Sequence, residues 1–211
     1  MLLFIFPILS LISQVLVAGM AVYTYRRLPR ELKILSFYFF LSVFFAGWQL
    51  ALALMRRHNL WISQSWMPIQ YALVMIPLAL WQPGRGLRTT ALVLVPAYIV
   101  VWVAFLALVG DMNAMSTYMR PLAGALFIGA SSTLLVRNVQ DETKQVLDDP
   151  AFWVATATII YFGGTVIFYS LVPSLMTMSL PVMRIAWSAQ AVLNIIANLL
   201  YAKAFLCPAR L

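Results

Sequence analysis

The chain has 211 residues, of which 64% are hydrophobic and 9% are charged. Soluble domains carry roughly 25% charged residues, so this composition excludes a soluble domain and indicates an integral membrane protein that contacts the lipid bilayer. The net charge of +8 comes mostly from basic residues between apolar runs, so we expect no nucleic-acid partner. The single cysteine, Cys207, excludes an intramolecular disulfide.

Seven apolar runs follow one another along the chain, each about 20 residues long, which is the length of one membrane crossing. We therefore predict an all-α, seven-transmembrane helix bundle that forms a single domain over residues 1–211. The predicted helices cover residues 2–24, 34–55, 60–81, 89–109, 117–136, 151–171 and 182–205. Asp149 followed by Pro150 is a typical helix start, because aspartate caps free amides and proline fits the first turn.

Basic residues predict the orientation. If the N-terminus is outside, the inner connections hold Arg26, Arg27, Arg30, Lys33, Arg85, Arg88, Arg137, Lys144, Lys203 and Arg210. The outer connections then hold only Arg56, Arg57, Arg120 and Arg184. This bias favours an outside N-terminus and a cytoplasmic C-terminus in a multi-pass protein of the bacterial inner membrane.

A polar stripe runs along the last predicted helix, WSAQAVLNIIANLLY at residues 187–201. Gln190, Asn194 and Asn198 recur every four residues and so share one helix face. Side-chain amides are costly in hydrocarbon without hydrogen-bond partners, so we expect this face to point into the bundle. There the amides either link helices or help to form a ligand pocket, and both interpretations stay open.

Further polar and aromatic residues define a candidate pocket between the second, third, sixth and seventh helices. Its predicted members are Gln49, Gln70, Tyr161, Gln190, Asn194 and Asn198, with Trp48, Trp66 and Trp187 supplying contact area. No charged residue lies in the middle third of a predicted span, which argues against a proton relay or an ion-coupled transporter. No hydrolase motif or acidic pair accompanies the lone His58, so we expect neither enzymatic activity nor a cofactor.

Two features of the predicted outer connections suggest other ligands. A basic group of Arg56, Arg57, His58, Arg120 and Arg184 has the charge to contact an anion or a lipid head group. The methionines Met112, Met115, Met176 and Met178 are spaced like Cu(I)-binding thioethers, although methionine is equally a plain apolar residue at a bilayer surface.

The segments YRRLPRELKILSFYF, DPAFWVATATIIYFGGTVIFYS and WSAQAVLNIIANLLYAKAFLC resemble small seven-helix membrane proteins of Bacteroidota-type genomes. The resemblance implies the architecture and little chemistry. The helix count is also similar to that of the seven-helix input modules of bacterial sensor kinases.

These observations lead to a functional hypothesis. We predict a membrane sensor or ligand-binding protein that acts through a cytoplasmic partner at residues 137–149, a polar segment with charges of both signs. Two alternatives are a non-catalytic accessory subunit of a membrane complex, and a channel or uncoupled transporter.

Overall fold

The computed structural model describes residues 5–109, 112, 117–140 and 146–207, which form α-helices, short 3-10 turns and no strand. The α-helices are α1 (Ile5–Thr24), α2 (Arg30–Leu54), α3 (Leu60–Leu80), α4 (Arg85–Leu108), α5 (Met119–Gln140), α6 (Pro150–Leu175) and α7 (Leu180–Leu206). The turns η2 (Tyr25–Arg27) and η3 (Val146–Asp148) precede α2 and α6. The predicted all-helical fold is therefore confirmed.

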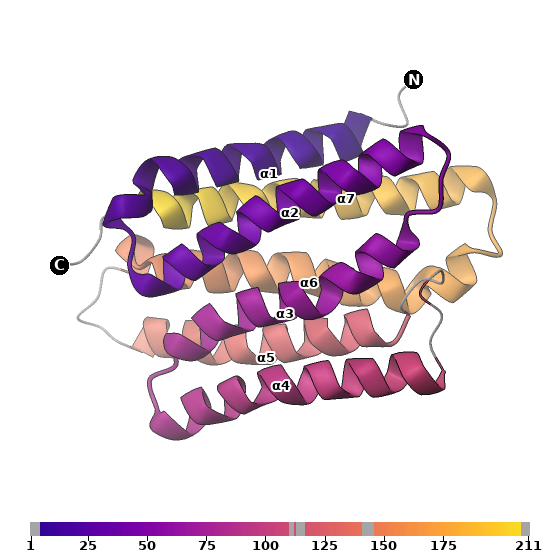
Figure 1. Cartoon of the computed structure of the whole chain (residues 1–211). Coiled ribbons are helices and arrows are strands. Elements are labelled where there is room, and N and C mark those ends of the chain that lie inside the picture. The colour runs from indigo at the N-terminus through magenta and orange to yellow at the C-terminus, as the bar shows by residue number, and fades with distance from the viewer. Residues whose placement is uncertain (1–4, 110–111, 113–116, 141–145, 208–211) are drawn as a thin grey trace.

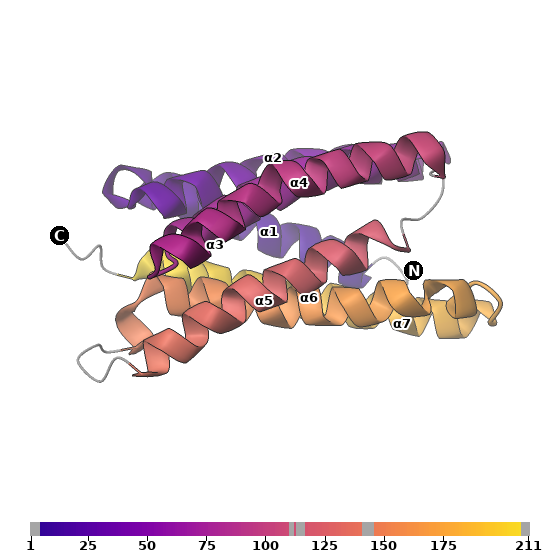
Figure 2. The ribbon, with the colours of Figure 1, turned by 90° about the horizontal axis from the view of Figure 1, so that it is seen from below.

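The helices form two layers (Figures 1 and 2). Helices α2, α3 and α4 make one layer, and α5, α6 and α7 make the other. Helix α1 packs against both α2 and α7 and closes one edge, whereas α5 contacts α3 and α4 at the opposite edge. Consecutive helices run in opposite directions, so the bundle has two ends. We call the end where α1 begins the N-end and the end where α7 finishes the C-end.

Six of the seven helices in the described part of the chain are long and apolar enough to cross a membrane. The exception is α3, which carries Ser63, Gln64, Ser65 and Gln70. Helix α3 is also enclosed by its neighbours, with about half of its residues buried, whereas only Ala91, Val95 and Tyr98 are buried on α4. A helix with this much of its surface against other helices tolerates such polar residues because they find protein partners.

Several helices extend beyond the predicted apolar runs. Helix α2 begins at Arg30 instead of residue 34, α4 begins at Arg85 instead of 89, and α5 continues to Gln140 instead of 136. The predicted ends were wrong because they followed hydrophobicity, whereas backbone hydrogen bonding continues through Arg, Lys and Gln, which are good helix formers. At the start of α6 the Asp149 carboxylate accepts a hydrogen bond from the Ala151 amide at 2.9 Å, as the capping motif predicts.

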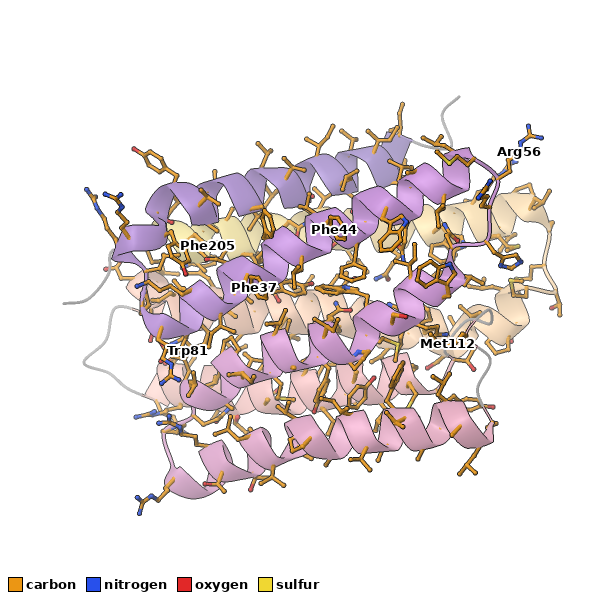
Figure 3. The ribbon with its side chains drawn as sticks, viewed as in Figure 1. Phe37, Phe44, Arg56, Trp81, Met112 and Phe205 are labelled. Carbon is orange, nitrogen blue, oxygen red and sulfur yellow. The ribbon has the colours of Figure 1, made fainter. Side chains whose placement is uncertain are left out.

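The outer faces of the helices are apolar. On α2, Phe37 and Phe44 are 54% and 58% exposed, and Figure 3 shows both on this helix, away from the bundle ends. Apolar side chains exposed on a bundle of this composition are what contact with lipid acyl chains requires. The described helices therefore fit a multi-pass membrane protein.

The two halves of the bundle interior differ. In the C-end half the Phe39 ring contacts the rings of Tyr201 and Phe205, with centroids 5.1 and 5.9 Å apart. The hydroxyls of Tyr201 and Thr158 lie 2.8 Å apart and join α7 to α6. Together with Leu32, Leu35, Leu78 and Val154, these side chains fill the space between the layers. In the N-end half, a cavity lies between the layers.

Candidate ligand-binding cavity

A cavity of about 200 Å³ lies between the two layers in the N-end half. Gln49, Ser63 and Arg120 line it close to the ends of their helices, whereas Tyr38 and Tyr161 line it near mid-helix. The full wall comprises Gln14, Tyr38, Ser42, Phe45, Ala46, Gln49, Ser63, Trp66, Gln70, Arg120, Tyr161, Tyr169, Trp187 and Gln190. Because a cavity needs only about 10–15 Å³ to hold one water, this one has room for a small organic molecule.

Helix periodicity explains how α2 and α3 form their part of the wall. On α2, Tyr38, Ser42, Phe45 and Gln49 follow one another at spacings of four, three and four residues. Side chains at these spacings lie on one helix face. Helix α3 contributes Ser63, Trp66 and Gln70 at spacings of three and four in the same way, so two stripes of mixed polarity meet at the cavity.

Aromatic rings make up much of the wall. The Trp66 indole stacks on Phe45 at 4.8 Å between centroids and on Tyr38 at 5.9 Å, and Trp66 is 8% exposed. Gln70 Nε2 donates a hydrogen bond to the Tyr38 hydroxyl at 3.3 Å. The rings are thus held in place by packing and by a hydrogen bond, which gives the cavity flat and rigid apolar surfaces.

Arg120, the second residue of α5, supplies the cation of the cavity wall. Its Nη2 donates hydrogen bonds to the carbonyl oxygen of Ser63, at 3.2 Å, and to the Ser63 hydroxyl. The guanidinium carbon lies 4.9 Å from the centre of the Tyr169 ring. Arg120 is therefore fixed from two sides, by α3 and by α6, and its charge faces a partly enclosed space.

The charge of Arg120 has no carboxylate opposite it in the described wall. The acidic residues that the structure describes are Glu31, Asp148 and Asp149, and all three lie at the C-end. Asp111 is outside the described residues. The described part of the wall is therefore electropositive, with one fixed cation among neutral amides, hydroxyls and aromatic rings.

A second, smaller cavity of about 20 Å³ adjoins the first, and the two share Gln70, Arg120 and Tyr161. Tyr71 also lines it, is 0% exposed, and its hydroxyl has no hydrogen-bond partner among the described residues. This space is large enough for a single water.

The structure brings together six of the predicted pocket residues and separates three. Those in the wall are Gln49, Gln70, Tyr161, Gln190, Trp66 and Trp187. Asn194 and Asn198 instead donate hydrogen bonds to the hydroxyls of Ser10 and Ser13 on α1, at 2.6 and 2.8 Å. Trp48 is 40% exposed and meets Trp61 edge-on at 5.4 Å. Ligand binding by any of these residues stays a prediction.

The predicted basic group divides in the same way. Arg56, Arg57, His58 and Arg184 are exposed, and Figure 3 shows Arg56 at the N-end. Arg120 instead lines the cavity. Anion or lipid contact by the exposed members stays a prediction.

Two further predicted sites are only partly described. Met112 is half-buried, Met176 and Met178 are exposed, and Met115 lies outside the described residues, so Cu(I) binding stays a prediction. Residues 141–145 of the proposed partner segment at 137–149 are also outside them.

Sequence reasoning missed several wall residues, among them Tyr38, Phe45, Ala46 and Tyr169. The signal for the first three was present, because they share the face of α2 that ends in Gln49. Tyr169 has a weaker signal, a spacing of two turns from Tyr161 on α6.

Comparison with protein-family models, with curated proteins and with solved structures finds no match. The geometry of the cavity is therefore the basis for a functional proposal.

Proposed function

We propose that all seven helices cross the inner membrane of a bacterium, with the N-end outside and the C-end in the cytoplasm. The distribution of charge supports this orientation. Among the described residues the C-end holds Arg26, Arg27, Arg30, Lys33, Arg85, Arg88, Arg137 and Lys203, and the N-end holds Arg56, Arg57, Arg120 and Arg184. Helix α3 crosses between α2 and α4, with its polar residues on the faces that meet other helices.

Within that topology, the protein is a ligand-binding sensor. The observation that carries this proposal is the asymmetry of the interior, which has a large cavity in the N-end half and is packed in the C-end half. A cavity that faces the outside and ends at a packed C-end half retains a ligand. A channel requires a continuous path, and the contacts of Phe39 with Tyr201 and Phe205 in the described interior support a binding protein over a channel.

Helix α5 offers a route from the cavity to a cytoplasmic partner. It begins beside the cavity with Arg120 and leads at the C-end into the 137–149 segment. Near its middle it is joined to the connection that follows α3, because Gln82 Nε2 donates to the Ala130 carbonyl at 2.8 Å and Thr133 donates to Gln82 Oε1 at 3.0 Å. A ligand that shifts Arg120 therefore moves a rigid element that ends at the partner segment.

The test is to fill the cavity. Ala46 lines it, so Ala46→Trp places a large ring inside, whereas Ala51→Trp puts the same ring on an exposed position of the same helix. Purified proteins in lipid nanodiscs are screened for thermal stabilisation by a panel of small acids, amines and neutral metabolites. We expect panel members that stabilise the wild type and Ala51→Trp but not Ala46→Trp. A panel without effect on the wild type would overturn the proposal.

A further inference from the structure

The charge and shape of the cavity wall carry an inference about the chemistry of the ligand, which rests on the proposed function. We infer that the cavity takes a small monocarboxylate with a flat apolar body, such as a simple aromatic acid, and that Arg120 binds the carboxylate while the aromatic wall encloses the rest.

The sign of the ligand's charge follows from Arg120. A guanidinium is always ionised, and a cation that faces a partly enclosed space favours an anionic ligand. Its contacts to the Ser63 carbonyl and hydroxyl both involve Nη2, and each is to a neutral oxygen. Among the described residues these contacts fix the group without neutralising it, which leaves its charge and its other N–H donors for a carboxylate.

The number of charges on the ligand follows from the rest of the cavity wall. Arg120 is the one basic residue among the residues that line the described cavity, and the others are neutral. A dianion such as a phosphate monoester would bring a second charge without a cationic partner into a partly enclosed space, which is costly. The single charge of a monoanion is matched by the single charge of Arg120.

The flat apolar body follows from the aromatic side chains. Phe45, Trp66 and Tyr38 form a stack along one side, with interplanar angles of 27° and 18° between neighbours. Trp187 and Tyr161 line the same space from α7 and α6. Rings prefer offset or edge contacts with other rings. About 200 Å³ corresponds to on the order of a dozen water positions, enough for a ligand of about ten non-hydrogen atoms.

The experiment compares matched probes in the full-length protein in nanodiscs. Benzoate, its neutral isostere benzamide and the cation benzylamine are titrated by calorimetry, with empty nanodiscs as the blank. We expect benzoate to bind about tenfold or more tightly than benzamide, because a hydrogen bond to a charged group is involved, and benzylamine not to bind. Arg120→Gln should remove the preference for benzoate. Arg184→Gln, which removes an exposed charge at the same end, should retain it.

Equal affinity of the wild type for benzoate and benzamide would overturn the inference, as would equal effects of Arg120→Gln and Arg184→Gln. If Arg120→Gln does not fold, Arg120→Lys, which keeps the charge, takes its place. The comparison of benzoate with benzamide in the wild type then decides the inference alone. Benzamide binding that Ala46→Trp abolishes, without a preference for benzoate, would refute the anion and leave the proposed pocket intact. No stabilisation of the wild type by any compound of the panel would refute the pocket itself.

Discussion

Asn198 on α7 donates a hydrogen bond from its Nδ2 to the hydroxyl of Ser13 on α1 at 2.8 Å, and so ties the last helix to the first. One turn earlier, Asn194 makes the equivalent contact with Ser10 at 2.6 Å. Gln190, two turns from Asn198, turns to α6 instead, where its Nε2 donates to the Thr165 hydroxyl at 2.8 Å, and it lines the cavity. The stripe therefore joins helices over most of its length and reaches the cavity at one end.

The Asn198–Ser13 pair should contribute measurably to stability. Interhelical hydrogen bonds of membrane proteins contribute about 0.6 kcal/mol on average and up to about 1.7 kcal/mol. We expect Asn198→Leu and Ser13→Ala each to lower the free energy of unfolding in mild detergent, with a coupling energy in this range for the double variant. Ser13 also donates to the Ser10 carbonyl of its own helix at 2.7 Å, and the change on α7 does not remove this acceptor. A coupling energy of zero would show that the bond contributes nothing.

Two stacked tyrosines should respond differently to loss of their hydroxyls. The rings of Tyr71 and Tyr98 lie 4.0 Å apart. The Tyr98 hydroxyl donates to the Met119 carbonyl at 3.1 Å, whereas that of Tyr71 has no partner among the described residues. We expect Tyr98→Phe to cost about 1 kcal/mol and Tyr71→Phe to be neutral or stabilising, measured by unfolding in the same detergent. A larger loss from Tyr71→Phe would point to a bound water in the small cavity beside it.

Two glycines of α5 provide a matched test of helix packing. A Cβ at Gly124 would lie 2.5 Å from Val166 Cγ2 and 3.4 Å from the Phe162 carbonyl of α6, whereas one at Gly129 would meet nothing within 4 Å. Valine has one strongly preferred rotamer in a helix and cannot turn aside. We therefore expect Gly124→Ala to destabilise the protein by about 1–3 kcal/mol and Gly129→Ala to be neutral or stabilising. Equal thermal stability of the two variants would contradict the close approach of α5 and α6 at Gly124.

The inward direction of the α7 stripe was predictable from sequence, because a row of amides in an apolar helix has to find hydrogen-bond partners. The identity of these hydrogen-bond partners was not predictable from sequence. Ser10 is 184 residues from Asn194, and only the packing of α1 against α7 brings the two together. Neither Ser10 nor Ser13 differs in local pattern from other hydroxyls of the apolar runs.

Arg120 shows a second limit of sequence reasoning. Its position near the start of a helix predicts a residue at the membrane surface, together with Arg56 and Arg184. A long side chain near a helix end reaches either the surface or the interior, and the rotation of the helix about its axis decides which. Packing of α5 against α3 and α6 sets that rotation, so sequence alone did not reveal the electropositive cavity.

The single cysteine allows the proposed orientation to be measured. Cys207 follows α7 directly at the C-end. A membrane-impermeant maleimide added to intact spheroplasts should leave Cys207 unlabelled and should label it after permeabilisation. Met178→Cys in a Cys207→Ser background places an exposed thiol between α6 and α7 at the other end and should give the opposite pattern. Labelling of Cys207 in intact spheroplasts would reverse the proposed topology.

The pH dependence of that labelling tests the local structure at the C-end. Burial raises the pKa of the Cys207 thiol above its ordinary value, the Lys203 ammonium opposes this rise, and the carboxylates of Asp148 and Asp149 add to it. Maleimide reacts with the thiolate, so a raised pKa lowers the reactive fraction at a given pH. In permeabilised membranes we expect the rate–pH curve to lie at higher pH than that of a cysteine peptide. Asp148→Asn should move the curve to lower pH and Lys203→Gln to higher pH. Identical curves for the protein and the peptide would show that the end of α7 does not pack against the segment before α6.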